Sequence, residues 1–317
     1  MKIMYTDTDH KSLDIERKVI QDAGLDFTVT QCRTEDDVIR ECRDADILIN
    51  QYAPITARVM DNLPNFKCVV RYGVGVDNIE VRAAVERGIT VCNIPDYGTN
   101  EVADQALALM LALVRKVPYM NEITRTVGWD CTYAFPIQRL STQTVGIIGL
   151  GRIGKALADR VHALGCTIIA CDHHLDPGVV HPCGYITGAT LDEVIEKSDI
   201  ISIHCPPVKG KYMLDADAFK RMKKGIYIIN DARGGIIDEE ALDRALEDGI
   251  VAGAALDCVK QEPMPLDSPL YRHKNLIVSP HMGWYSVQAA IDLKRKVAEQ
   301  AVKFAQTGTV DYPVFTN

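Results

Sequence analysis

The sequence lacks any apolar stretch of the ~18 residues that a membrane-spanning helix requires. It also lacks an excess of basic residues, because 35 lysines and arginines face 43 aspartates and glutamates and leave a formal net charge of -8. Nucleic-acid binding needs a basic face. Charged residues interrupt the first apolar run early, which predicts a first β-strand rather than a signal peptide. We therefore expect neither a membrane nor a nucleic acid as partner.

Cysteine pairs are absent as well, since the ten cysteines are scattered singly and form no C-x-x-C motif. This usage predicts reduced, mostly structural thiols in a cytoplasmic protein. Residues 171–183 collect two cysteines and three histidines, whose side-chain atoms are types that zinc binds. Their spacing matches no standard zinc pattern, so we expect a solvated loop there and no metal.

The length of 317 residues is sufficient for two domains. Five short strand patterns rich in Val, Ile and Thr alternate with helical patterns before residue 99, and seven more strand patterns alternate with helical ones from residue 145. Such alternation is typical of parallel sheets covered by helices. We predict an α/β fold of two doubly wound parallel-sheet domains. Residues 1–98 and 288–317 would form a smaller, flavodoxin-like domain, and residues 99–287 a larger Rossmann domain.

A long helix is predicted between the two sheets, over residues 99–116. Thr99 or Asn100 can cap its start, and basic residues close its end. Its apolar positions cover too wide an arc for a surface helix. We expect it to pack both within the chain and against a second copy, and therefore predict a homodimer formed through the larger domain.

A glycine-rich motif, Gly149-x-Gly151-x-x-Gly154, follows an apolar strand pattern and opens a helical one. In this context the first glycine permits a tight turn, and the second lets a pyrophosphate approach the backbone. The third lets helix and strand pack closely. Arg152 and Ile153, inside the motif, would belong to the same site. A glycine-rich turn that serves packing alone is the alternative.

A carboxylate, Asp172, ends the next strand pattern, 18 residues after Gly154. At this place a carboxylate accepts hydrogen bonds from the ribose hydroxyls of NAD and repels the 2′-phosphate of NADP. Protonation of His173 or His174 would weaken that repulsion, so NADP is the alternative. The pattern predicts that residues 99–287 bind NAD.

Three further motifs come at or after the ends of strand patterns: NDARGGIID (230–238), LDCVKQEP (256–263) and SPHMGWYS (279–286). Doubly wound sheets bind ligands at this edge. Together with the glycine motif and the N-terminal RYGVGVDNI, these motifs resemble the D-isomer-specific 2-hydroxyacid dehydrogenases over essentially the whole chain. The tryptophan that follows the histidine in PHMGWYS is most similar to the C-terminal-binding-protein-like branch of that family.

The resemblance implies three catalytic residues. His281 would be the acid/base that protonates the 2-oxo group, and Glu262 would hold its ring and favour imidazolium. Arg233 would grip the substrate carboxylate, which a planar guanidinium does well. The chemistry itself requires such groups, because a 2-oxo acid carries a carboxylate that needs a cation and a carbonyl oxygen that needs a proton near neutral pH. A structural histidine, an ion-paired arginine and a plain loop carboxylate are the alternatives.

The resemblance also implies contacts to the cofactor and the substrate. Asp257 would orient the carboxamide of nicotinamide, and other cofactor contacts are expected from Cys205, Pro206, Ala232 and Gly283. In residues 1–98, the smaller substrate (catalytic) domain, the implied substrate contacts are Tyr52, Arg71, Val74 and Gly75. Trp284 would join Tyr52 around the substrate side chain, and such aromatic walls suit a medium apolar or aromatic side chain.

Two places depart from the family's pattern. Val208 and Lys211 stand where threonines are usual, and Asp231 replaces a further threonine and adds negative charge near the nicotinamide. Neither change removes a catalytic group.

The predicted function is therefore NAD-dependent interconversion of a 2-oxo acid and a D-2-hydroxy acid, in a cleft between the two domains. The alternative is an NAD(H)-sensing scaffold, or corepressor-like protein, with incidental dehydrogenase activity. The compact chain favours the enzyme, because it shows no long polar tail or linker for docking partners.

Overall fold

The computed structural model describes residues 1–315, which divide into two compact units. Residues 1–98, together with the segment that starts at Ser286, form the first unit, and Thr99–Tyr285 form the second. The chain thus returns to the first unit at Ser286, whereas the sequence placed this boundary after residue 287. Each unit is an α/β structure built on one parallel sheet, as the alternating strand and helix patterns predict.

The sheet of the first unit has five strands in the order β2-β1-β3-β4-β5, and all its pairs are parallel. This order is the flavodoxin-like one, which confirms the predicted fold of this unit. All five predicted strands are present. Their bounds are β1 (Ile3–Tyr5), β2 (Phe27–Val29), β3 (Ile47–Asn50), β4 (Cys68–Arg71) and β5 (Thr90–Cys92).

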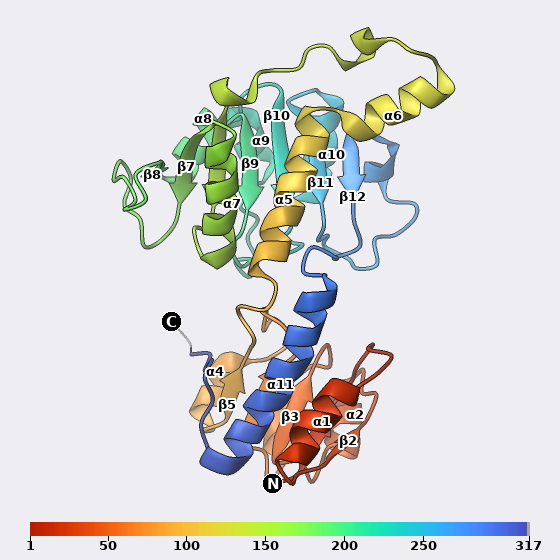
Figure 1. Ribbon diagram of the computed structural model, residues 1–317, viewed down its shortest axis with the longest axis vertical. Coiled ribbons are helices and arrows are strands. Elements are labelled where there is room, and N and C mark those ends of the chain that lie inside the picture. The colour runs from red at the N-terminus through yellow and green to blue at the C-terminus, as the bar shows by residue number, and fades with distance from the viewer. Residues whose placement is uncertain (316–317) are drawn as a thin grey trace. The chain divides into compact units, whose positions relative to one another are not determined.

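Five helices cover this sheet, and the last of them comes from the C-terminal segment. They are α1 (Asp14–Asp22), α2 (Glu35–Glu41), α3 (Ala57–Asn62), α4 (Val81–Glu86) and α11 (Val287–Thr307). Helix α11 packs against α1 and the strands β3 and β4 (Figure 1). It begins where Ser286 Oγ accepts the N–H of Ala289 at 2.9 Å, and it ends at Gly308, whose φ of 71° suits glycine. Its buried face, which includes Leu293, Val297 and Phe304, explains why it joins this unit.

The sheet of the second unit has seven strands in the order β12-β11-β10-β9-β6-β7-β8. The chain starts the sheet at β6, adds β7 and β8 on one side of it, and then adds β9 to β12 on the other, which is the Rossmann arrangement. The bounds are β6 (Thr144–Ile148), β7 (Thr167–Cys171), β8 (Ile186–Gly188), β9 (Ile200–Ile203), β10 (Ile226–Asn230), β11 (Val251–Leu256) and β12 (Leu276–Val278). All seven strand patterns that the sequence offers from residue 145 onward are therefore strands.

Helices cover both faces of this sheet (Figure 1). Its α-helices are α5 (Thr99–Val114), α6 (Val117–Thr126), α7 (Arg152–Ala163), α8 (Leu191–Lys197), α9 (Ala216–Arg221) and α10 (Glu239–Glu247). Short 3₁₀ turns are η1 (Cys131–Ala134), η2 (Leu140–Thr142) and η3 (Pro269–Arg272). One core cluster joins α5 and α7 to Ile147 and Ile229, and another joins α8, α9 and α10 to Ile148 and Ile228. Consecutive strand residues thus enter opposite cores, so the strands are apolar throughout.

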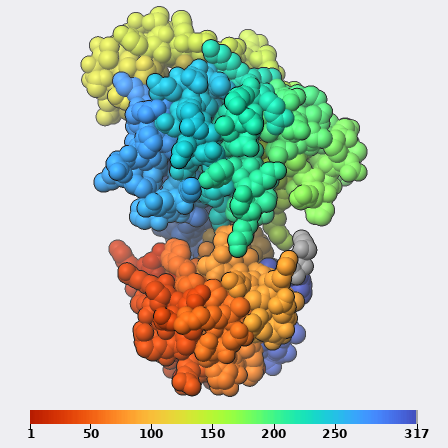
Figure 2. Space-filling view, turned by 180° about the vertical axis from the view of Figure 1, so that it is seen from behind, coloured from red at the N-terminus to blue at the C-terminus, as the bar shows by residue number. Residues whose placement is uncertain are grey.

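Helix α6 and the segment after it leave the compact part of the second unit before the chain returns at β6 (Figure 1). In the space-filling view this stretch forms a lobe of the second unit (Figure 2). No helix within residues 1–315 has the length and apolar content that crossing a membrane requires.

Candidate active site

Three predicted catalytic residues come together in the second unit. Arg233 follows β10, Glu262 follows β11 and His281 follows β12, and these three strands are neighbours in the sheet. Because all of them are parallel, the loops after their carboxyl ends meet at one edge. Motifs that are far apart in the sequence therefore build one constellation.

His281 and Glu262 form a direct pair. The distance from His281 Nδ1 to Glu262 Oε2 is 2.7 Å, and the two side chains are 41% and 39% exposed. Glu262 also accepts the N–H of Val259 at 3.1 Å. Partial burial favours the neutral acid, but the hydrogen bond and charge of His281, the Val259 N–H and the charge of Arg233 outweigh it and lower the pKa of Glu262. Glu262 is thus an ionised partner, and the imidazole keeps Nε2 for another contact.

The loop that carries His281 is fastened to the end of β11. His281 has a φ of 52°, a left-handed conformation that is uncommon for a residue other than glycine. Its N–H donates to the carbonyl of Asp257 at 2.9 Å. The carboxylate of Asp257 accepts bonds from Ser279 Oγ (2.5 Å), Met282 N (3.1 Å) and Gly283 N (2.8 Å). These contacts hold the strained backbone of His281 in place.

Asp257 and Gly283 therefore have a structural task that the motifs did not reveal. Asp257 is 3% exposed, and a Cβ added at Gly283 would lie 3.0 Å from its Oδ2. Glycine lets the loop close onto the carboxylate. Whether Asp257 also orients the carboxamide of nicotinamide stays a prediction.

Arg233 lies on a loop that Asn230 shapes from the last position of β10. Asn230 Nδ2 donates to the carbonyl of Arg233 at 2.8 Å, and its Oδ1 accepts the N–H of Ala232 at 3.2 Å. Arg233 Nη1 donates to the carbonyl of Ala232 at 2.7 Å. The guanidinium is one of the charges that lower the pKa of Glu262, which places it beside the pair. Sequence reasoning missed Asn230, although an amide directly at a strand end was a signal for it.

The glycine-rich loop has the geometry that a pyrophosphate needs. Gly149 has a φ of 94°, and a Cβ there would lie 2.7 Å from the backbone of His204. A Cβ on Gly154 would lie 2.1 Å from the carbonyl oxygen of Gly149, so helix α7 could not pack as closely. A Cβ on Gly151, by contrast, would meet nothing within 4 Å, so the backbone there is open. The helix that starts at Arg152 directs its free N–H groups toward this opening.

Asp172 follows the last residue of β7 and is tied to this loop. Its Oδ2 accepts the N–H of Leu150 at 2.7 Å and its Oδ1 accepts the N–H of His174 at 2.9 Å. A carboxylate has about four acceptor positions, so two more can serve ribose hydroxyls. The residues present therefore fit a dinucleotide.

A buried pair, His204 and Asp231, lies below these loops and was not predicted. Asp231 Oδ1 is 3.3 Å from His204 Nδ1, and the two side chains are 0% and 1% exposed. Burial lowers the pKa of His204 to about 3. Burial, reinforced by the charge of Asp257, raises the pKa of Asp231 well above its ordinary value. Burial thus favours the neutral carboxyl of Asp231, whereas the sequence led us to expect a negative charge there.

The remaining residues of the segment after β9 are nearer the surface. Cys205 is partly buried, and its Sγ contacts Met213 Sδ at 3.4 Å, while Pro206 is exposed. Val208 and Lys211, which replace threonines, form an exposed turn in which the N–H of Lys211 donates to the carbonyl of Val208 at 3.1 Å.

The predicted substrate residues of the first unit lie at or just after the carboxyl ends of β3 and β4. Tyr52 is 62% exposed and Val74 is 38% exposed. Arg71 Nη1 donates to the carbonyl of Tyr72 at 2.8 Å, and the carbonyl of Val74 accepts the side-chain amide of Asn93 at 2.6 Å. Gly75 lies in the same partly exposed loop. Trp284 belongs to the second unit, where its ring meets Tyr285 edge-on at 5.5 Å.

The cysteines and histidines of residues 171–183 form no group of three possible metal ligands in the structure. All ten cysteines are free. Within residues 1–315, one group of three donor side chains has its ligand atoms within 4.8 Å of one another, namely Cys258, Glu262 and His281, and the segment 171–183 supplies none. Burial, with the charges of Asp257 and Glu262, raises the pKa of the Cys258 thiol well above its usual range. A protonated thiol is a poor metal ligand, so this group is interpreted as the His–Glu pair with a buried neighbour.

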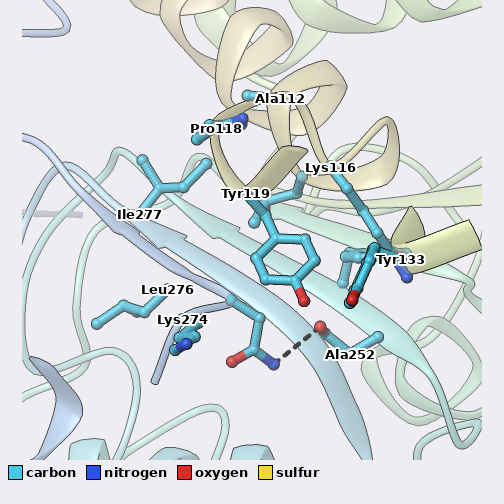
Figure 3. Close-up of a pocket in the computed structure, with 12 residues that line it drawn as sticks. Ala112, Lys116, Pro118, Tyr119, Tyr133, Ala252, Lys274, Leu276 and Ile277 are labelled. Carbon is cyan, nitrogen blue, oxygen red and sulfur yellow. Dashed lines mark hydrogen bonds between the residues drawn. The ribbon is translucent and has the colours of Figure 1, made fainter. Parts of the chain in front are cut away.

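A separate cavity of about 340 Å³ opens at the other ends of the strands of the second unit (Figure 3). Tyr227, Ala252 and Leu276, from the amino ends of β10, β11 and β12, form one side of it. Tyr119 of α6 and Tyr133 of η1 point into it from the opposite side (Figure 3). The cavity shares no residue with the constellation around His281.

A Rossmann unit with an open glycine loop, a carboxylate after its second strand and an Arg–Glu–His constellation defines a nicotinamide-dependent oxidoreductase. Comparison with known proteins identifies the family. Residues 107–283 match the NAD binding domain of the D-isomer specific 2-hydroxyacid dehydrogenases. The chain belongs to this family, and its second unit is an NAD-binding domain whose cofactor is NAD.

Relatives with curated names are similar over most of the chain. A glyoxylate reductase from Thermofilum pendens is 38% identical over 277 residues, which cover 85% of this chain and 80% of that protein. A hydroxypyruvate reductase from Blautia hydrogenotrophica is 34% identical, with 86% of each chain covered. A D-3-phosphoglycerate dehydrogenase from Bacillus subtilis is 38% identical over 82% of this chain, but this chain spans only 49% of that protein.

Solved structures show the same fold. The TT0316 protein from Thermus thermophilus superposes with a TM-score of 0.85 at 30% identity and covers 99% of this chain and all of that chain. A D-lactate dehydrogenase from Aquifex aeolicus, complexed with NAD and lactic acid, has a TM-score of 0.85 at 23% identity, with 96% of each chain covered.

Proposed function

We propose that the protein reduces a 2-oxo acid to the D-2-hydroxy acid with NADH, or catalyses the reverse oxidation, and that His281 is the acid/base. The observation that carries this proposal is the 2.7 Å contact between His281 Nδ1 and the ionised Glu262, next to the loop of Arg233. Because Nδ1 faces Glu262, Nε2 is the atom that exchanges a proton with the substrate oxygen. Family membership supports the same assignment.

Each proposed group has a defined task in the reduction. Bound NADH supplies the hydride for C2 of the substrate. Protonated His281 gives its proton to the carbonyl oxygen, and the neutral imidazole left behind is the base for the reverse reaction. Arg233 pairs with the substrate carboxylate. The same carboxylate accepts hydrogen bonds from the backbone N–H groups of Val74 and Gly75 and from Arg71. Tyr52 and Trp284 are proposed to line the substrate side chain.

The direct test is oxidation of NADH with a series of 2-oxo acids graded by side chain, from glyoxylate through hydroxypyruvate to phenylpyruvate. We expect turnover with at least one of them and a product of D configuration. If none of them is reduced while NAD(H) changes the state of assembly, the protein is a sensing scaffold instead.

Cofactor contacts are proposed for the glycine loop with Arg152 and Ile153, and for Asp172, Asp257, Ala232, Gly283, Cys205 and Pro206. Asp172→Ala should lower kcat/KM for NADH by about 10- to 100-fold, because two charge-assisted hydrogen bonds to the ribose are lost. The preference for NADH over NADPH should narrow as well, since the repulsion of the 2′-phosphate disappears. Asp172→Asn keeps an oxygen for the N–H of Leu150 and serves as the matched control for loop structure. Equal use of both cofactors by the wild type would contradict this role.

Glu262→Gln tests the coupling within the catalytic pair. Although burial opposes it, the hydrogen bond and charge of His281 help to lower the pKa of Glu262, so the carboxylate is ionised beside the ring near neutral pH. Glutamine keeps the shape and one acceptor but removes the charge. kcat/KM for reduction should therefore be lower in the variant at neutral pH, and the difference from the wild type should shrink as the pH falls through the lowered pKa of Glu262. A difference that does not change with pH would mean that the charge of Glu262 plays no part in the reaction.

We further propose that two copies associate through the second unit. Several large apolar side chains of α6 and the following segment are exposed: Val117, Val127, Trp129, Tyr133 and Phe135. Trp129 is 96% exposed, which is costly for the largest apolar side chain unless a partner covers it. Tyr133 also lines the cavity described above, so the exposed apolar stretch reaches that cavity.

We also propose a cellular compartment for the protein and a branch of its family. The ten free cysteines suit a reducing compartment, so we propose the cytoplasm. Trp284, directly after the His281 loop, supports placing the chain near the C-terminal-binding-protein-like branch of its family.

A further inference from the structure

Two carboxylates that follow β1 hold the turn that carries Tyr52. Asp7, which is 6% exposed, accepts the backbone N–H groups of Gln51 (3.2 Å), Tyr52 (2.7 Å) and Ala53 (3.2 Å). Asp9 accepts the Tyr52 hydroxyl at 3.1 Å and the side-chain amide of Gln51 at 2.6 Å. In all of these bonds the carboxylate is the acceptor, as an ionised carboxylate must be. The orientation of the Tyr52 ring is therefore set by two negative charges.

The same turn is joined to the loop that is proposed to bind the substrate carboxylate. Asn78 Nδ2 donates to the carbonyl of Ala53 at 3.0 Å and to Asn50 Oδ1 at 2.7 Å. Burial and the charge of Asp9 raise the pKa of the Tyr52 hydroxyl, and the charge of Arg71 opposes them. Arg71 is thus within electrostatic reach of the turn, and the two loops form one surface of the first unit.

The negative charge beside the Tyr52 hydroxyl disfavours a second anionic group on the substrate. Arg71 is proposed to serve the carboxylate that every 2-oxo acid carries. His10 is partly buried next to Lys294, and both effects lower its pKa, so it adds no positive charge near neutral pH. Lys294 donates to the carbonyl of Ser12. Asp9, whose side chain is 60% exposed, accepts the Tyr52 hydroxyl at 3.1 Å and so places a negative charge at the tip of that side chain.

We propose that Asp9 is a specificity-determining residue that selects 2-oxo acids with uncharged, hydrogen-bonding side chains and rejects phosphorylated ones. This inference rests on the proposed function, in which Tyr52 faces the substrate side chain. The carboxylate retains lone pairs that accept a substrate hydroxyl, whereas a phosphate carries two negative charges toward it. In a largely aqueous site, Coulomb repulsion between a carboxylate and a doubly charged phosphate within about 4 Å of it corresponds to a preference of about tenfold or more for the unphosphorylated substrate. Relatives named for glyoxylate and hydroxypyruvate reduction thus describe the substrate class better than those named for 3-phosphoglycerate.

The test compares two substrates that differ only in the phosphate, hydroxypyruvate and 3-phosphohydroxypyruvate, with NADH as cofactor. We expect the wild type to prefer hydroxypyruvate by at least about 100-fold in kcat/KM, because the lost hydroxyl contact adds to the repulsion. Asp9→Asn keeps the shape and an acceptor for the Tyr52 hydroxyl but removes the charge. It should narrow the preference about tenfold, chiefly through a lower KM for the phosphorylated substrate. Asp22→Asn removes the same charge from an exposed ion pair on α1 and should leave the preference unchanged.

Equal or better turnover of 3-phosphohydroxypyruvate by the wild type would overturn the proposal, and so would an unchanged preference in Asp9→Asn. If neither substrate is turned over, the proposed function is in doubt rather than the charge selection. Binding of D-glycerate and 3-phospho-D-glycerate to the protein saturated with NAD⁺ then decides the matter, because calorimetry measures the same preference without turnover. Tighter binding of the phosphorylated acid would refute the role of Asp9.

Discussion

Replacing His281 with alanine should lower kcat for 2-oxo acid reduction by about 10²- to 10⁴-fold, the range that one positioned acid/base contributes. NADH affinity should stay within about twofold of the wild type, because the glycine loop and Asp172 lie on other strands than His281. Stopped-flow or steady-state NADH oxidation measures the first quantity, and fluorescence titration with NADH measures the second. The two results together separate a catalytic histidine from a structural one.

Two variants control for the structural cost of the substitution. His281→Asn accepts the left-handed φ of 52° better than alanine does, so it keeps the loop but not the proton transfer. His273→Ala removes another histidine–carboxylate pair of the same unit, in which Nε2 is 2.8 Å from Asp243 Oδ1. It should cost stability but retain kcat. Loss of NADH binding together with activity in both His281 variants would identify a structural histidine.

Replacing Asp231 with asparagine should stabilise the protein increasingly as the pH rises. The pKa of Asp231 is raised well above its ordinary value because the carboxyl is buried and lies near the charge of Asp257. Folding therefore requires this group to take up a proton that the unfolded chain has released above pH ~3.9. Asparagine is neutral at every pH and makes no such demand.

The size of the effect follows from proton linkage. Between the ordinary and the raised pKa, the native wild type binds one more proton at Asp231 than the unfolded chain does. Its stability relative to Asp231→Asn should fall by about 1.4 kcal/mol per pH unit in that window. His204, whose pKa is about 3, is neutral in both native proteins throughout this range, so its contribution cancels in the difference.

Urea unfolding of both proteins at several pH values from about 5 to about 8 measures this difference. Asp267→Asn, which changes an exposed acid before η3 in the same way, is the matched control. A pH-independent difference for Asp231→Asn would show that Asp231 is ionised in the native protein.

The strands and the convergence of three loops on one sheet edge could both be predicted from the sequence. Runs such as those of β6 and β9 are apolar at consecutive positions because helices cover both faces of a parallel sheet. Motifs that follow these strands meet at one edge because parallel strands end on the same side. Arg233, Glu262 and His281 could therefore be grouped without knowledge of any distance.

The supporting contacts could not be predicted in the same way. Asp7 and Asp9 follow β1, while the turn of Tyr52 follows β3, and these two strands are neighbours only because the sheet order is β2-β1-β3. Asn230 could have been noticed at its strand end, but its partners depend on how the loop folds back.

The sequence by itself thus determined the class of fold, the cofactor and the residues that converge on one sheet edge, since each depends on a local pattern or on strand direction. Only the tertiary structure decided the charge of Asp231 and the place of Asp9. Burial and contact distance control the ionisation of a carboxyl, and both depend on which strands become neighbours. The neutral form of Asp231 is favoured because the packing of the strands buries its carboxyl away from water and near the charge of Asp257.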